Sequence, residues 1–296
     1  MWKARLRDGI EFAGKFTVNR GINVTKTLSS YYYSRITRKA VHWGYPISIS
    51  IEPTTSCNLR CPECPSGLRA FSRPTGMLQE ETFRNVIDQV SSHTPYLILY
   101  FQGEPYLNKA FFDYVTYATS KNMYVATSTN AHYLNDVNAK KTVESGLSRL
   151  IISIDGTTQE TYKSYRVGGK LDKVLEGAKN VVEWKRKLKS KTPHIIFQYL
   201  VVKPNEHQTD DILKIAKEIG VDEVKFKTAQ VYDYENGNEL IPENEKYSRY
   251  KKNKKTGKYD IKNQLLNHCW KLWQSCVFTW DGKVVPCCFD KDATHT

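Results

Sequence analysis

Three cysteines, Cys57, Cys61 and Cys64, lie within eight residues of one another. This spacing places three thiols in one short loop, and three thiolates can bind a single iron–sulfur cubane while its fourth iron keeps no protein ligand. Such an open iron can take a cofactor or a substrate. The alternatives are a zinc knuckle and cysteines that are merely buried. Structural zinc usually has four protein ligands, and the nearest further donor, His93, is distant in the sequence.

The segments around these cysteines alternate between short β-branched runs and longer amphipathic stretches. Strands are predicted at 47–51, 96–101, 123–128, 149–154, 195–202 and 223–227. Helices are predicted at 79–92, 109–121, 136–145, 172–189 and 209–219. Six successive strand–helix units imply a parallel sheet, so the expected fold class is α/β, a partial (β/α)6 TIM-like barrel. In such barrels ligands bind at the C-terminal ends of the strands, where the cysteine loop also lies.

The cysteine loop after the first strand, followed by strand–helix repeats, resembles the radical S-adenosylmethionine (SAM) superfamily over roughly residues 47–228. The resemblance implies a 4Fe–4S cluster on Cys57, Cys61 and Cys64, with SAM bound to the open iron. It also implies that reductive cleavage of SAM yields a 5'-deoxyadenosyl radical. Glu63 stands where the family often has an aromatic residue that flanks the adenine.

The resemblance extends to a set of pocket residues. Residues 102–105, Gln-Gly-Glu-Pro, resemble the family's Gly-Gly-Glu-Pro motif, in which backbone carbonyls bind the SAM amino group. Ser153 and Asp155, at the end of the fourth strand, correspond by position to family residues near the ribose and the methionine carboxylate. Asn130, at the end of the third strand, is a further pocket candidate. Similar arginines pair with the SAM carboxylate, which a guanidinium fork matches. The implied cofactor-binding residues are Gly103, Glu104, Pro105, Asn130, Ser153, Asp155 and Arg166.

The C-terminal cysteines resemble the opening of a SPASM module, which carries auxiliary clusters. Cys269, Cys276 and Cys287 are the candidate ligands of a second 4Fe–4S cluster, with Cys288 as an alternative. An Asp-Gly pair at 281–282 predicts a tight hairpin turn that brings the second and third of these cysteines together. The family pattern continues further, so the module is incomplete here. Either the sequence is a fragment, the cluster keeps an open iron, or these thiols bind zinc or nothing.

Composition narrows the possible binding partners and the cellular location. The chain has 44 Lys and Arg against 31 Asp and Glu, a net charge of +13, which favours an anionic substrate, a nucleic acid or an anionic membrane surface. Seven cysteines, an odd number, and no long apolar run favour a reducing, cytoplasmic location. We expect three regions: a basic, partly helical extension at 1–45, the barrel at 46–245, and a basic linker with the SPASM-like start at 246–296.

The predicted function is that of a radical SAM enzyme reduced by a flavodoxin- or ferredoxin-like donor. Its substrate is unidentified, a peptide, a protein or a small molecule such as a sugar derivative. A different class, a non-catalytic zinc or iron–sulfur protein that binds RNA through its basic segments, predicts metal without SAM affinity. A cysteine-nucleophile hydrolase is disfavoured, because no Cys–His pair stands out.

Overall fold

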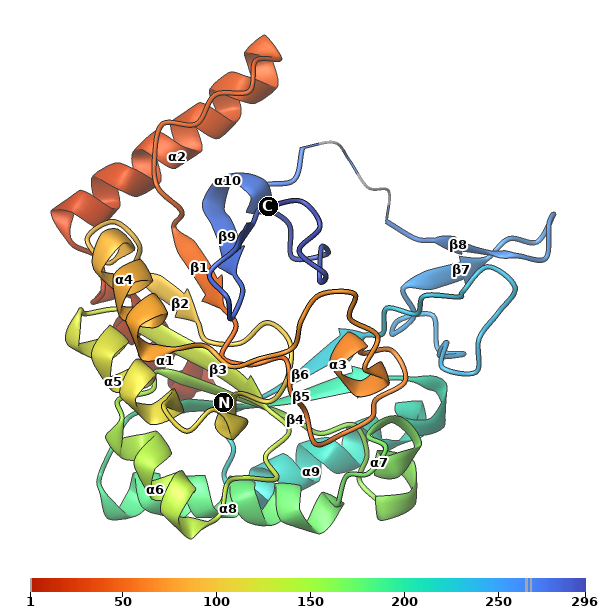
Figure 1. Cartoon of the computed structure of the whole chain (residues 1–296). Helices are drawn as coiled ribbons and strands as arrows, with labels where there is room; N and C mark the ends of the chain where they lie inside the picture. Colours follow the sequence, from red (N-terminus) through yellow and green to blue (C-terminus); the bar gives the residue numbers. More distant parts are fainter. Residues whose placement is uncertain (1, 264–265, 267) are drawn as a thin grey trace.

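The computed structural model describes residues 2–263, 266 and 268–296, and its centre is a curved sheet of eight strands (Figure 1). Six strands are parallel and follow one another in sequence order, which confirms the predicted α/β partial barrel. Their bounds are β1 (Ser48–Ile51), β2 (Tyr96–Ile98), β3 (Tyr124–Thr129), β4 (Arg149–Ser153), β5 (His194–Val201) and β6 (Glu223–Thr228).

The five predicted helices are all present, and they cover the outer face of the sheet (Figure 1). They are α4 (Glu80–Val90), α5 (Phe111–Ser120), α6 (Asp136–Glu144), α8 (Leu171–Lys187) and α9 (Thr209–Ile219). In α4, for example, Phe83, Ile87 and Val90 repeat at helical spacing and are buried. Burial of such a stripe against the sheet stabilises the helix more than its intrinsic propensity does.

Several short elements escaped prediction because each spans only a few residues. Within the barrel they are α3 (Pro65–Leu68), η1 (Pro105–Leu107), α7 (Gln159–Tyr165) and η2 (Lys203–Gln208). The basic stretch at 246–262, predicted as part of a linker, contains an antiparallel hairpin of β7 (Tyr250–Lys252) and β8 (Tyr259–Ile261).

The C-terminal cysteine segment extends the barrel sheet itself. After α10 (Lys271–Gln274), β9 (Ser275–Phe278) pairs in parallel with β1, so that Cys276 lies opposite Ile49. β10 (Val284–Val285) then returns antiparallel to β9. The turn between them is the predicted hairpin, in which Gly282 has a φ of +84°. The sheet therefore joins the two cysteine-bearing segments through one strand pair.

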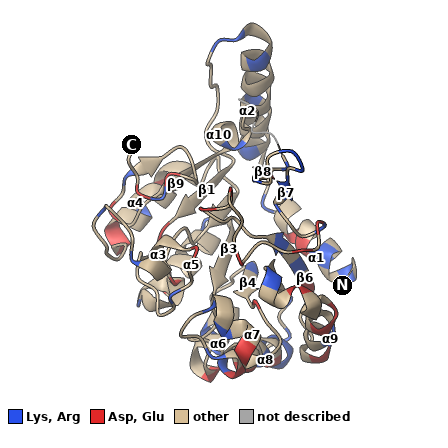
Figure 2. Ribbon diagram, turned by 90° about the vertical axis from the view of Figure 1, so that its right-hand side faces the viewer, with Lys and Arg blue, Asp and Glu red and all other residues tan. Residues whose placement is uncertain are grey.

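Two helices, α1 (Trp2–Ala13) and α2 (Val18–Thr37), make up most of the basic N-terminal region. The α1 carboxylate of Asp8 is buried and contacts Tyr124 of β3 and Arg149 of β4. The Phe12 ring packs edge-on against Tyr124 at 5.4 Å. Helix α2, in contrast, projects from the body of the molecule (Figures 1 and 2). Among the residues described here, no helix has the length and apolar character that would let it cross a bilayer.

Candidate functional site

The three cysteines of the predicted cluster site follow β1 in a loop that ends in α3. The backbone N–H of Cys64 donates to the carbonyl of Cys61 at 3.3 Å, which closes a turn between them. The N–H of Leu59 points to the Cys57 sulfur at 3.4 Å. Cys61 is buried, and Cys57 and Cys64 are half-buried. All three cysteines line the same cavity.

One cavity gathers the three thiols together with most of the predicted pocket residues. The predicted residues on its wall are Cys57, Cys61, Cys64, Gly103, Glu104, Asn130, Ser153 and Arg166. Pro105 and Asp155 are not among its lining residues. Sequence reasoning missed Leu59, Ser66, Gly67, Tyr100, Ser128 and Thr129, which also line it. The glycine at 67 was a usable signal, because a side chain there would meet the Cys61 backbone nitrogen at 2.5 Å.

Gly103 lets its loop approach the cysteine loop closely. Its φ is +71°, and a Cβ at this position would lie 2.3 Å from the carbonyl oxygen of Thr54 and 2.7 Å from that of Ser56. Only glycine fits such an approach without strain. The Gly103 N–H donates to the Ser66 hydroxyl at 2.9 Å, and the Glu104 N–H donates to the Ser56 carbonyl at 2.8 Å. The two loops thus form one continuous wall.

Glu104 holds the end of β3 against this wall. Its carboxylate is 2% exposed and accepts hydrogen bonds from the Thr129 hydroxyl at 2.7 Å and the Asn130 N–H at 2.8 Å. The N–H of Tyr106 donates to the same carboxylate at 3.3 Å. Burial raises the pKa of Glu104 to about 7, although these hydrogen bonds oppose the shift. The side chain therefore positions neighbouring backbone and is satisfied within the protein.

The raised pKa predicts a pH-dependent stability of the cluster-free protein. An exposed glutamate ionises near 4.5, so between roughly pH 4.5 and 7 the folded state holds a proton that the unfolded state has lost. The stability that Glu104 contributes is complete below pH 4.5 and is lost as the pH rises through 7. Chemical unfolding at several pH values should show this loss, up to about 3 kcal/mol.

Glu104→Gln should remove that part of the pH dependence, because glutamine does not titrate. The exposed Glu81→Gln is the matched control and should leave the slope unchanged. A Glu104→Gln variant with the same pH slope as the unaltered protein would contradict the assignment.

Arg166 links the cysteine loop to the end of β4. Its Nε donates to the Asp155 carboxylate at 2.5 Å, and its Nη1 lies 3.8 Å from the Cys61 sulfur. The other Asp155 oxygen accepts from the Leu200 N–H at 2.7 Å. Asp155 and Arg166 therefore bind each other, and their predicted contacts with SAM stay predictions. The guanidinium places positive charge beside a thiol that would be a thiolate when it ligates iron.

The thiols at the predicted cluster site are weakly acidic. Burial raises the pKa of the Cys57 thiol to about 11, and it raises that of Cys61 as well. Thiols in such an environment become thiolates when a metal replaces the proton. Within the described part of the chain, no three Cys, His, Asp or Glu side chains surround a point where one metal ion could sit. A cubane spreads its ligands over separate irons, so three thiols around one cavity, with an open side, fit a cluster.

Side-chain hydrogen bonds also tether the cysteine loop to neighbouring segments. Glu63 accepts a hydrogen bond from the Tyr232 N–H at 3.0 Å, so this acidic residue joins the loop to the segment after β6. Asn130 donates to the Asn58 side chain at 2.7 Å and lies 3.9 Å from the Cys57 sulfur. These contacts hold the cysteine loop in place.

The C-terminal cysteines are less enclosed. Cys276 and Cys287 are half-buried on either side of the β9–β10 hairpin, whereas Cys269 and Cys288 are exposed. Burial raises the pKa of the Cys276 thiol to about 11. The second cluster on Cys269, Cys276 and Cys287 stays a prediction.

Comparisons with known proteins agree with this geometry. The family model of the radical SAM superfamily matches residues 51–192, and that of an iron–sulfur cluster-binding domain, SPASM, matches residues 269–296. A radical SAM domain implies a 4Fe–4S cluster and SAM.

Two curated relatives and one solved structure illustrate the similarity. An AdoMet-dependent heme synthase of Methanosarcina barkeri is 31% identical over 176 residues, 59% of this chain and 48% of the relative. A PqqA peptide cyclase of Rhodopseudomonas palustris is 25% identical over 199 residues, 65% of this chain and 49% of the relative. The chain thus spans about half the length of these proteins.

The crystal structure of Streptococcus suis SuiB bound to S-adenosylmethionine superimposes with a TM-score of 0.64 at 11% identity. The match covers 90% of this chain and 65% of SuiB, and it supports the fold alone. The family matches fall on the cysteine loop with its cavity and on the C-terminal cysteines. Residues 51–192 of this chain form a domain of the radical SAM superfamily, and residues 269–296 form a SPASM-type iron–sulfur segment.

Proposed function

We propose that this protein cleaves S-adenosylmethionine reductively at a 4Fe–4S cluster on Cys57, Cys61 and Cys64 and abstracts hydrogen from an anionic substrate. The observation that carries the proposal is the single cavity in which the three thiols share a wall with Gly103 and Arg166. A metal-containing protein that only binds RNA would not need the three thiols to share a cavity wall with Gly103 and Arg166.

The chain's own residues have distinct tasks in this proposal. The bound cluster and SAM would supply the one-electron cleavage that generates a 5'-deoxyadenosyl radical. The absence of a side chain at Gly103 leaves the backbone of its loop free to approach a cofactor amino group. Asn130 and Ser153 offer polar side chains at two neighbouring strand ends, where they can orient bound SAM. Arg166, next to Cys61, would offset the negative charge of the ligating sulfur.

The anionic character of the substrate rests on the β7–β8 hairpin. Tyr250 of β7 is buried in the same apolar cluster as Leu59 and Cys61, so the base of the hairpin lies beside the cysteine loop. Exposed cations follow on the hairpin: Lys251, Lys252, Lys254, Lys255 and Lys258. A substrate with carboxylate or phosphate groups would be attracted to this side of the cavity. We also propose a cytoplasmic location and a flavodoxin- or ferredoxin-like electron donor, because the cluster needs a reducing environment.

Deoxyadenosine formation tests the proposal. The protein is reconstituted with iron and sulfide without oxygen, reduced with dithionite and mixed with SAM. Mass spectrometry should then detect 5'-deoxyadenosine, and its formation should depend on both cluster and reductant. An intact, reducible cluster that yields no deoxyadenosine would contradict the proposed function.

A further inference from the structure

The projecting helix α2 buries its polar face and exposes its apolar face. Its buried residues are Arg20, Asn23, Thr27, Ser30, Tyr31 and Ser34. The exposed face carries Val18, Ile22, Tyr32 and Ile36, which are 79%, 50%, 55% and 81% exposed. A helix on the surface of a globular protein normally has the opposite arrangement. Packing of α2 against the barrel therefore does not explain why its apolar residues are exposed.

The polar face is buried because it binds backbone carbonyls of the body. The Arg20 guanidinium donates to the carbonyls of Ser91, at 2.6 Å, and Asn122, at 2.6 Å. Asn23 donates to the Tyr45 carbonyl at 3.0 Å and accepts from the Tyr45 N–H at 2.7 Å. These bonds fix the rotation of the helix about its axis. The apolar side consequently points away from the protein.

The apolar stripe lies at both ends of the helix and has two polar residues between them. With 3.6 residues per turn, positions 18, 22, 25, 29, 32 and 36 lie within about 40° of one line. Four of these positions are apolar, and the two in the middle are Thr25 and Ser29. Lys26 and Arg35 lie about 80° and 100° to either side of this line. Long basic side chains at the two edges of an apolar stripe can reach outward past it, as they do in helices that lie in a membrane interface.

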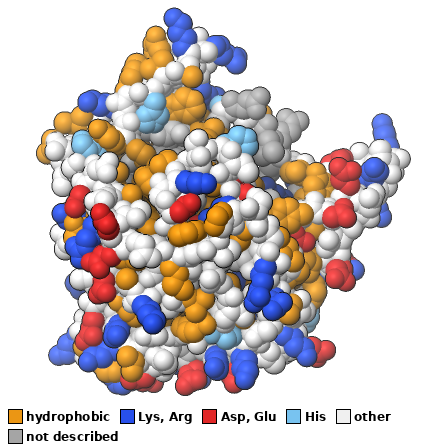
Figure 3. Space-filling view, in the orientation of Figure 1, with side chains coloured by type: hydrophobic (Ala, Val, Ile, Leu, Met, Phe, Trp, Pro, Cys, Tyr) orange, Lys and Arg blue, Asp and Glu red, His pale blue; other side chains and the backbone are white. Residues whose placement is uncertain are grey.

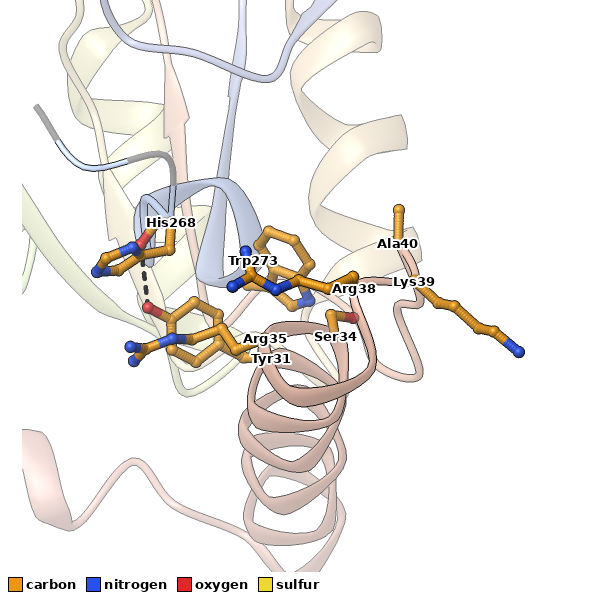
Figure 4. Close-up of a pocket in the computed structure, with 8 residues that line it drawn as sticks. All are labelled: Tyr31, Ser34, Arg35, Arg38, Lys39, Ala40, His268 and Trp273. Atoms are coloured by element: carbon orange, nitrogen blue, oxygen red, sulfur yellow. Dashed lines mark hydrogen bonds between the residues drawn. The ribbon is translucent and has the colours of Figure 1, made fainter.

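All charged side chains in α2 and its flanking segments are basic. No Asp or Glu occurs between Glu11 and Glu52, a stretch that contains six Lys or Arg. At the C-terminal end of the helix, Arg35 and Arg38 extend to the same side of a pocket that Tyr31 and Trp273 also line (Figure 4). Figure 3 shows hydrophobic and basic side chains side by side on this projection. Apolar and aromatic groups edged by cations match an anionic lipid surface.

We propose that α2 docks the protein on an anionic membrane surface, with its apolar stripe in the headgroup region and Arg35 and Arg38 on lipid phosphates. A second copy of the chain is the less favourable occupant. Two copies of α2 would bring Lys26 and Arg35 of each helix together with no acidic residue on either helix to pair with them. The proposal does not depend on the radical chemistry, and its test does not use activity.

Flotation of the full chain with lipid vesicles tests the docking. We expect it to float with vesicles of phosphatidylcholine and phosphatidylglycerol and to stay at the bottom with phosphatidylcholine alone. The double variant Arg35→Gln/Arg38→Gln should bind roughly 30-fold more weakly. Ile22→Ser/Ile36→Ser should bind at least about tenfold more weakly.

Matched controls are available elsewhere on the surface. Lys254→Gln/Lys255→Gln removes two exposed cations from the hairpin, and Val137→Ser removes an apolar side chain that is 60% exposed. Both controls should bind as the unaltered protein does, and circular dichroism should show that all variants melt alike. Absence of flotation, or equal binding by test and control variants, would overturn the proposal. So would light scattering that shows a dimer which the isoleucine variant dissociates, since a second copy would then cover the stripe.

Discussion

Cys61→Ala should lower deoxyadenosine formation by at least about a thousandfold, to the rate of cluster-free protein, because the cofactor carries the chemistry. Cys61 is the most buried of the three thiols, and the Arg166 guanidinium lies beside its sulfur. Its loss leaves two thiolates to hold a cubane that needs three. Iron and sulfide analysis should show the loss of the cluster, and mass spectrometry should show the loss of the product.

Cys288→Ala is the matched control for this variant. Cys288 is exposed and lies in the C-terminal segment, outside the cavity. Its replacement should leave deoxyadenosine formation within about twofold, a change of about 0.4 kcal/mol in the barrier. A Cys61→Ala protein that keeps both its iron and its product would refute the ligand assignment.

Arg73→Met should lower the free energy of unfolding by about 3–5 kcal/mol. Arg73 forms two hydrogen bonds to Glu52, at 2.6 and 2.8 Å, and both side chains are almost fully buried. Its Nε also donates to the Lys291 carbonyl at 2.9 Å, while Glu52 accepts from the Trp280 N–H at 3.3 Å. The pair thus joins the end of β1, the segment after the cysteines and the C-terminal region. Methionine would leave a buried carboxylate without its partner.

Two comparisons make the Arg73 prediction specific. Arg84→Met breaks an exposed ion pair with Glu80 and should cost less than about 1 kcal/mol. Glu52→Gln combined with Arg73→Met should recover part of the lost stability, because no buried charge then remains unpaired. Urea unfolding measures all four proteins. If Arg73→Met cost no more than Arg84→Met, the buried pair would not hold these segments together.

The barrel was predictable because its signals are local. Each predicted strand is a short β-branched run, and each predicted helix carries an apolar stripe of its own. The pairing of β9 with β1 has no such signal, since the two strands lie more than 200 residues apart and each spans only four residues. The orientation of α2 was equally hidden, because the hydrogen bonds of Arg20 that set it reach carbonyls far along the chain.

The site residues that stand in short sequence motifs were predictable, and those whose role depends on contacts between distant segments were not. The cysteines, Gly103 and Glu104 stand in short motifs, and all five residues line one cavity in the structure. Ser66 was missed because its role, to accept the Gly103 N–H, appears only when the two loops meet. Asp155 was assigned to SAM from its position at a strand end, but it does not line the cavity. Its carboxylate binds Arg166 and the Leu200 N–H, partners that β5 and α7 bring to it.

The most direct measurement is electron–nuclear double resonance on the reduced, reconstituted protein with SAM that carries a nitrogen isotope label at its amino group. Direct ligation of that nitrogen to the open iron would give a strong hyperfine coupling, and the coupling should vanish in Cys61→Ala. A reduced 4Fe–4S signal without any coupling to bound SAM would contradict the central claim that the cavity at Cys57, Cys61 and Cys64 presents a vacant iron to this cofactor.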